Sequence, residues 1–163
     1  MSSAFIHAIA EREAPAWIVT QQHNAFPSYR RAQAQTLVTG NRIFLYTTGG
    51  CFRNPTRDKG RIIGRAVVVR RAHPLDESVR FGEPSFGIGV GLRIERLVAS
   101  HEGIELAPLV SALTRTFPLG RCWSGRMRHA LAPSAPGDAD LIQRRRLDLI
   151  AVPHGDAHNQ YAA

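Results

Sequence analysis

The chain has 163 residues, 44% of them hydrophobic, and a formal net charge of +8. This length and composition fit one globular domain with a core of its own and exclude wholesale disorder. No apolar stretch approaches the ~20 residues of a membrane span, and the N-terminus lacks the basic start of a signal peptide. We therefore expect a soluble, cytoplasmic protein with one domain over residues 1–150 and a polar, flexible tail over residues 151–163.

The N-terminal part of the chain predicts two strands separated by short helices. Its first apolar run is hydrophobic on both faces apart from His7, which is typical of a central strand. Acidic residues followed by Pro15 indicate the start of a helix. The expected elements are a strand over residues 4–10, a helix over 15–22, a loop over 23–30, a short helix over 31–38 and a strand over 42–48.

The remainder of the chain combines long strands with helical segments. Apolar residues alternate in GIGVGLRIERLV, and Gly64 inside another apolar run indicates a bulge or a close backbone approach. Asp138 is placed to cap the last helix. We expect a basic loop over residues 49–60, a strand over 61–71, an irregular connection over 72–84, a strand over 87–98, a helix over 106–116, an extended piece over 123–132 and a helix over 138–149.

This order of elements predicts an α+β fold. Strand-rich runs broken by short helices favour a curved mixed sheet over a regular β-α-β array. We expect five or six strands with peripheral helices.

The sequence lacks the motifs of common cofactor and catalytic sites. Neither a phosphate-cradling loop nor a nucleophile elbow is present, and the cysteines and histidines have no metal-ligand spacing. Cys51 lies in a basic loop that would lower the pKa of its thiol, but no histidine lies close in sequence to act as a base. We therefore expect no metal, no cofactor and no catalytic residue, and a binding module rather than an enzyme.

The positive charge predicts a nucleic-acid partner. Lys59 is the only lysine among 21 basic residues, which stand against 13 acidic ones. A codon bias explains arginine over lysine, but less easily the excess over acids. Guanidinium groups bind phosphates and stack on bases. The cations that we expect on the nucleic-acid backbone are Arg53, Arg57, Lys59, Arg61, Arg121 and Arg126, whereas Arg144, Arg145 and Arg146 fit a solvated helix face.

Aromatic residues supply a possible base-binding wall. Such side chains can sandwich an unstacked base, although the alternative for each of them is a place in the core. Tyr46 and Trp123 are favoured because hydroxyl residues follow them, and a planar polar ring needs both stacking and hydrogen bonds. The set comprises Phe26, Tyr29, Tyr46, Phe52 and Trp123.

Four short motifs follow one another along the chain: FPSYRRAQA, GNRIFLYTT, RIIGRAVVV and WSGRMRHALAP. In this order they resemble the motifs of the EVE domain family. FPSYRRAQA matches the family's aromatic, two small positions and V-R-N-Y-Q-A, and GNRIFLYTT matches its G-D-x-v-f-f-Y-h-S strand. RIIGRAVVV and WSGRMRHALAP resemble two later motifs of the family. The first strand, FIHAIAEREAP, departs from the aromatic-rich strand that usually ends in S-E-P, and Arg31 and Asn41 replace the usual Asn and Asp.

The resemblance implies a PUA-like β-pseudobarrel, related to YTH and ASCH domains. It also implies a pocket for a modified base, often a modified cytosine, flipped from DNA or RNA. The residues that match the family's motif positions are Phe26, Arg30, Tyr46, Thr47, Thr48 and Arg128. We add Trp123 from its own sequence context and expect Phe26, Tyr46, Thr47, Thr48 and Trp123 to line one cavity.

Two other functions stay open at this point. An ASCH-like amidohydrolase acting on a modified nucleoside would need a lysine, a threonine and a carboxylate to converge, and Lys59, Thr48 and Glu95 are the set available. The other is an RNA-binding accessory domain without base selectivity. Neither alternative requires a different fold.

Overall fold

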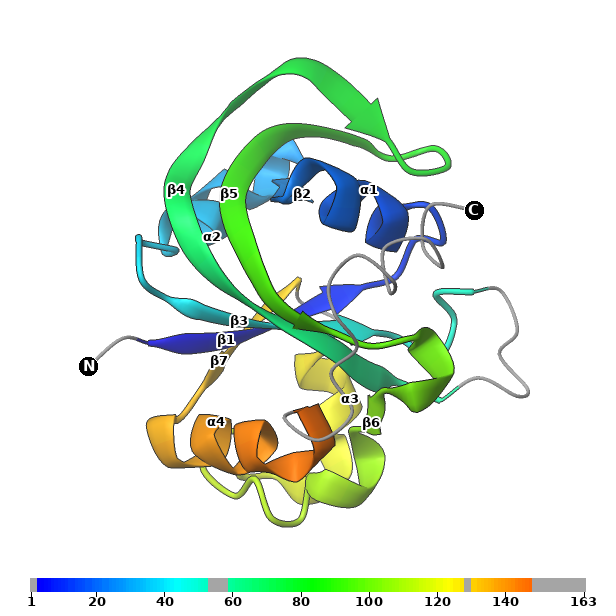
Figure 1. Ribbon diagram of the computed structural model, residues 1–163, viewed down its shortest axis with the longest axis vertical. Coiled ribbons are helices and arrows are strands. Elements are labelled where there is room, and N and C mark those ends of the chain that lie inside the picture. The colour runs from blue at the N-terminus through cyan, green and yellow to red at the C-terminus, as the bar shows by residue number, and fades with distance from the viewer. Residues whose placement is uncertain (1–2, 53–58, 128–129, 148–163) are drawn as a thin grey trace.

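The computed structural model describes residues 3–52, 59–127 and 130–147. Within these residues a seven-stranded sheet runs in the order β2-β5-β4-β3-β1-β7, and β6 pairs with β4. The sheet is open and strongly curved, with helices on both sides (Figure 1). The expected α+β class and curved mixed sheet are confirmed, with more strands than expected. Arg53, Arg57, Arg128 and the tail over residues 151–163 lie outside the described residues.

The centre of the sheet separates two apolar cores. Strand β1 (Ala4–Ile9) pairs in parallel with β3 (Arg42–Thr47) and antiparallel with β7 (Leu131–Ser134). Successive side chains of a strand point to opposite faces. Phe5 therefore joins one hydrophobic cluster and Ile6 the other. This explains why the first strand is apolar on both faces.

A long hairpin curls over one of these cores. It consists of β4 (Arg61–Arg80) and β5 (Ser85–Leu97), and β2 (His23–Phe26) pairs antiparallel with β5 (Figure 1). Several register shifts between β4 and β5 allow the bend. Gly64 permits a close approach, because an added Cβ would stand 2.6 Å from the Arg96 carbonyl oxygen. The expectation for this glycine is confirmed.

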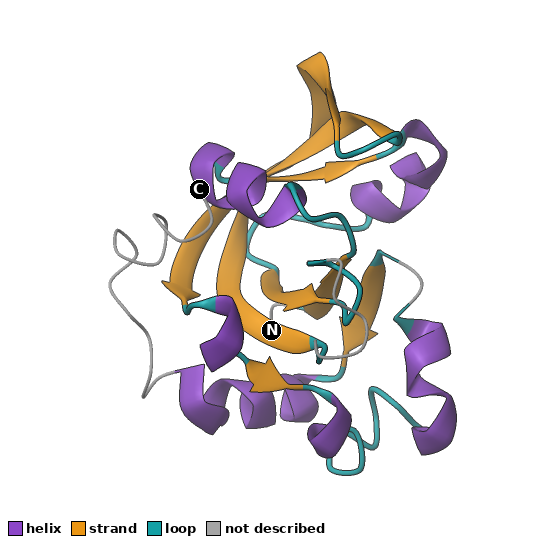
Figure 2. Cartoon of the chain, turned by 90° about the vertical axis from the view of Figure 1, so that its right-hand side faces the viewer, coloured by secondary structure: helices purple, strands orange, loops and turns teal. Residues whose placement is uncertain are grey.

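Helices cover the two faces of the central strands (Figure 2). Helix α1 (Ala14–Gln21) belongs to the cluster of Phe5, and α4 (Pro136–Ile142) belongs to the cluster of Ile6. No described helix is long and apolar enough to cross a membrane. The shorter elements are η1 (Ser28–Arg30), α2 (Arg31–Gln35), η2 (Ser100–Glu102), β6 (Ile104–Glu105), η3 (Ala107–Leu109), η4 (Gly120–Cys122), α3 (Trp123–Arg126) and η5 (Gln143–Leu147).

Four expected elements are wrong, each because tertiary contacts override local pattern. The expected loop over residues 23–30 contains β2, which exists because β5 offers it a partner. The irregular connection over residues 72–84 is largely the continuation of β4. Residues 106–116 form a short 3₁₀ helix followed by turns rather than an α-helix, although Leu106, Leu109, Val110 and Leu113 are buried as their spacing predicts. Residues 123–132 begin as α3 before β7.

Asp138 also differs from its expected role. Helix α4 begins at Pro136, and Asp138 lies inside its first turn without capping it. Its Oδ2 accepts hydrogen bonds from the backbone N–H of Thr116 at 2.7 Å and of Arg115 at 3.1 Å. The carboxylate therefore ties α4 to a distant segment of the chain.

Candidate functional site

A cavity of about 650 Å³ opens where the two cores meet, at the ends of β1 and β3. Its volume lies within the range of about 300–1,000 Å³ that is typical of small-molecule sites. The segment from His7 to Glu11, helix α1, the turn around Tyr29, the end of β3 and helix α3 all contribute to its lining. Segments far apart in sequence thus build one concave site.

Two aromatic side chains form part of the apolar wall. Tyr46 is 4% exposed, and its ring lies against Gly60, where an added Cβ would overlap the tyrosine hydroxyl. Burial raises the pKa of Tyr46 to about 12, so the phenol keeps its proton and remains a hydrogen-bond donor. Trp123 packs edge-on against Phe117, with ring centroids 6.3 Å apart. Both rings are held in place by the cluster beneath the sheet.

A cation lies at another part of the lining. Arg30 donates to Oε1 of Gln33 at 3.3 Å, and Gln33 donates to the Leu131 carbonyl at 3.1 Å. The Arg30 guanidinium carbon stands 5.5 Å from the ring centroid of Tyr29, which is 80% exposed. These contacts position Arg30 at the cavity, and Gln33 links it to β7.

His7 is a deeply buried polar side chain of the lining. It is 5% exposed, and its ring meets that of Phe26 in a T-shaped contact at 5.4 Å. Burial, and to a smaller extent the nearby Arg30 charge, lower the pKa of His7 to about 4, although a hydrogen bond to the Ala130 backbone opposes the shift. The imidazole is therefore neutral at physiological pH. Sequence reasoning missed this residue, although a lone polar side chain in an apolar strand was the available signal.

The structure divides the expected pocket residues into those that line the cavity and those that do not. Arg30, Tyr46, Thr48 and Trp123 line the cavity. Phe26 and Thr47 do not line it, which corrects the expected geometry. Phe26 is completely buried in the core, and the Thr47 hydroxyl donates to the Arg61 carbonyl at 3.3 Å. The physical reason for Thr47 is the alternation of a strand, which turns it away from the face that Tyr46 and Thr48 share.

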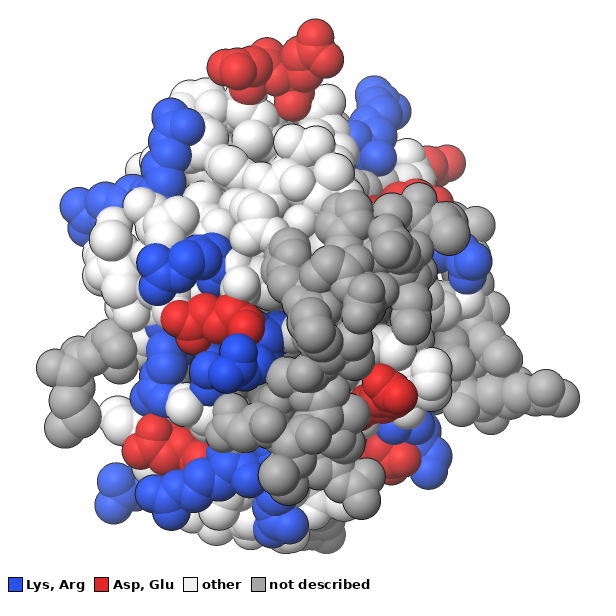
Figure 3. Space-filling view, in the orientation of Figure 1, with Lys and Arg blue, Asp and Glu red and all other residues white. Residues whose placement is uncertain are grey.

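The expected backbone-binding cations are only partly described. Lys59 and Arg61 each form an ion pair with Glu105 at 3.4 Å, and Arg61 also donates to the Gly103 carbonyl at 3.1 Å. Arg121 and Arg126 lie in η4 and α3, on either side of Trp123 in sequence. Basic and acidic side chains interleave on the face drawn in Figure 3. Phosphate contact by these residues stays a prediction.

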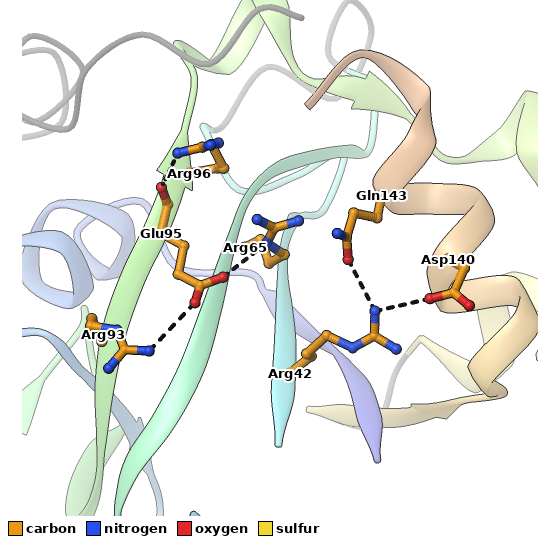
Figure 4. Close-up of polar contacts among 7 residues, drawn as sticks. All are labelled: Arg42, Arg65, Arg93, Glu95, Arg96, Asp140 and Gln143. Atoms are coloured by element: carbon orange, nitrogen blue, oxygen red, sulfur yellow. Dashed lines mark hydrogen bonds and ion pairs between the residues drawn. The ribbon is translucent and has the colours of Figure 1, made fainter. Parts of the chain in front are cut away.

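The residues of the alternative hydrolytic set have separate partners. Glu95 accepts from Nε of Arg65 at 3.1 Å and pairs with Arg93 at 3.5 Å (Figure 4). Lys59 pairs with Glu105, and of the three only Thr48 lines the cavity. Cys51 is completely buried, and its thiol donates to the Glu11 carbonyl at 3.5 Å. These contacts do not favour either catalytic alternative.

The chain shares its architecture with solved structures of nucleic-acid-binding domains. No family model and no curated protein matches it. Human THYN1, solved in complex with DNA containing 5-methylcytosine, superimposes with a TM-score of 0.56 and 16% identity over 93% of this chain and 99% of THYN1. The Mmi1 YTH domain, solved with RNA, gives a TM-score of 0.56 and 13% identity over 92% of this chain and 83% of that domain.

This chain has the PUA-like fold of EVE and YTH domains. The bacterial protein Rpa0253 from Rhodopseudomonas palustris adds a third example, with a TM-score of 0.55 and 17% identity over 92% of this chain and 96% of that protein. The resemblance read from the motifs is thereby confirmed in the architecture. Identities in this range establish the fold, so the ligand of this PUA-like domain has to be argued from its own cavity.

Proposed function

We propose that this domain binds nucleic acid and accepts one modified base, flipped out of its strand, in the cavity between the two cores. The observation that carries the proposal is the combination of an aromatic wall with polar groups in a single cavity of about 650 Å³. The 5-methylcytosine-containing DNA bound by THYN1 and the RNA bound by the Mmi1 YTH domain support it.

The cavity chemistry matches what a flipped base requires. A base that leaves its stack must regain stacking, which Tyr46 and Trp123 can supply. It must also satisfy the polar edge that it used for pairing, for which Thr48, Arg30 and His7 offer partners. The net charge of +8 attracts the phosphate backbone that carries the base.

A modified cytosine is the base that we propose. A methyl or hydroxymethyl substituent would lie against the apolar part of the wall, and one such group contributes about 1–3 kcal/mol to discrimination. Either DNA or RNA can present it, because a flipped base is bound away from its duplex.

The proposal is tested by measuring oligonucleotide affinities with modified and unmodified cytosines at a single position. Tyr46→Ala and Trp123→Ala should abolish the preference for the modified base while leaving salt-dependent background binding, because stacking is lost and the charge is retained. Leu119→Ala is the control, since Leu119 is 76% exposed and does not line the cavity.

Retention of the preference in both aromatic variants would show that the base binds elsewhere. Equal binding of every oligonucleotide by the unaltered protein would favour the accessory domain without base selectivity. Mass analysis of the bound nucleotide distinguishes both from an amidohydrolase, which would change its mass.

A further inference from the structure

One residue that lines the cavity has a buried polar atom without a protein partner. Nδ1 of His7 is buried and has no hydrogen-bond partner among the described residues, and the whole side chain is 5% exposed. Buried polar groups in folded proteins are nearly always hydrogen-bonded, so an unpaired one calls for an explanation, and a ligand atom in the adjoining cavity would supply one. His7 lines the same cavity as Tyr46 and Trp123.

The His7 ring is held on its other sides. Phe26 packs against it with an interplanar angle of 73°, and Phe26 is itself completely buried. The Ala130 backbone favours the protonated ring, which means that the imidazole donates to the Ala130 carbonyl. That carbonyl is anchored because it also accepts from the N–H of Ala8 at 2.9 Å. The ring therefore has little freedom to turn Nδ1 elsewhere.

The protonation state determines what Nδ1 can recognise. A neutral imidazole has one N–H donor and one acceptor nitrogen. Because the donor is used on Ala130, Nδ1 is the acceptor. Arg30, which also lines the cavity, has only donors. The cavity thus offers one deep acceptor and a donor group from Arg30.

A base enters such a cavity with its pairing edge first, because the sugar is attached at the opposite side. At the same position of that edge, cytosine and adenine carry an amino group, whereas uracil, thymine and guanine carry a carbonyl oxygen. An amino group donates to Nδ1, but a carbonyl oxygen would place two lone pairs against each other.

We propose that His7 is a specificity-determining residue that accepts a hydrogen bond at Nδ1 from the exocyclic amino group of the flipped base. The domain then selects amino-bearing bases, cytosine or adenine, over bases with a carbonyl at that position. This inference rests on the proposed function, since it concerns the same cavity.

The test changes the base and the protein together. Oligonucleotides carry at one position 5-methylcytosine, 5-methyl-2-pyrimidinone, which has hydrogen in place of the amino group, or thymine, which has oxygen there. The unaltered protein should bind the second and third about tenfold or more weakly, because a buried acceptor is left unpaired. A second pair of oligonucleotides carries adenine or unsubstituted purine at that position, which makes the same replacement of an amino group by hydrogen on the larger ring system.

Variants separate recognition from folding. His7→Phe should bind the three pyrimidine oligonucleotides within about twofold of one another, because no acceptor remains. His7→Gln keeps an acceptor oxygen and should restore part of the discrimination. His101→Phe is the matched control, since His101 is exposed in η2 and does not line the cavity.

The outcomes distinguish this inference from the function on which it rests. If the unaltered protein prefers 5-methylcytosine over cytosine but binds 5-methyl-2-pyrimidinone equally well, the role of His7 is overturned and the proposed function stands. Tighter binding of a uracil or guanine derivative overturns it as well. If no modification changes the affinity and Tyr46→Ala has no effect, both proposals fail. Thermal melting checks that each variant is folded, and the base series with the unaltered protein decides even if His7→Phe does not fold.

Discussion

The cavity at the ends of β1 and β3 and the polar cluster around Asp138 use buried hydrogen-bonding groups in opposite ways. In the cluster, the Oδ2 atom of Asp138 accepts from the backbone and the hydroxyl of Thr116, and this hydroxyl also lies 3.4 Å from that of Ser134. By contrast, Nδ1 of His7, a residue that lines the cavity, is left without a partner among the described residues. A satisfied network stabilises a fold, whereas an unsatisfied group is available to a ligand.

The largest effect is expected when the satisfied cluster is broken. Asp138→Ala removes the acceptor of three hydrogen bonds and leaves buried donors of Thr116 unpaired. We expect the free energy of unfolding to fall by about 3 kcal/mol or more, measured by urea denaturation. Asp140→Ala is the control, because the Asp140 carboxylate is exposed and pairs with Arg42 at the surface, a contact that contributes about 0–1 kcal/mol (Figure 4). Equal losses of unfolding free energy in Asp138→Ala and Asp140→Ala would show that the buried cluster stabilises the fold no more than the surface ion pair does.

Lowering the pH should destabilise the folded protein through His7. Its pKa in the folded protein is about 4, below the ordinary value of 6.5, so the unfolded chain takes up a proton that the folded chain does not. Above pH 6.5 His7 is neutral in both the folded and the unfolded chain, and the free energy of unfolding is unaffected by its titration. As the pH falls from 6.5 toward 4, protonation of the unfolded chain lowers the free energy of unfolding, by roughly 3 kcal/mol in total.

Unfolding free energies at about pH 7 and about pH 4.5 measure this loss. His7→Phe removes the titrating group, so its stability should fall less over the same interval. Identical pH profiles for the two proteins would mean that His7 is not buried in its neutral form.

Closing the space beside Tyr46 should weaken binding with a smaller effect on the fold. Gly60→Ala places a methyl group where the Tyr46 hydroxyl lies, and the ring has to move. We expect a loss of about 1–3 kcal/mol in affinity for the modified oligonucleotide, as for the loss of one stacking contact. Gly50→Ala is the matched control, since nothing lies within 4 Å of the added Cβ. Unchanged affinity in Gly60→Ala would remove Tyr46 from the binding wall.

The smallest effect concerns cations that already have partners. Glu105→Gln removes the carboxylate that pairs with Lys59 and Arg61 and frees both for phosphates. Affinity should rise by about twofold for all oligonucleotides alike, with a steeper salt dependence. Glu77→Gln makes the same change in net charge on an exposed part of β4. If the two variants gain equally, only net charge matters and the freed cations do not contact the strand.

Local patterns in the sequence determined the long strands and part of the cavity wall. Alternating or continuous apolar runs predicted β1, β3 and β5 to within about two residues, because strand periodicity is a property of neighbouring residues. Tyr46 and Trp123 could be selected as cavity residues because their hydroxyl neighbours were visible in the sequence. The helical spacing after Leu106 predicted burial correctly, but not the helix.

Only the tertiary structure decided the features that depend on a distant partner. Strand β2 needs the edge of β5, and Asp138 acts on Thr116 rather than on its own helix. Phe26 is buried in the core and Thr47 turns away from the cavity, although both match the motif that suggested a binding role. A polar residue in an apolar strand has no evident purpose until the fold brings β7, Phe26 and Arg30 around it. The role that we propose for His7 therefore rests on contacts between segments that are far apart in the chain.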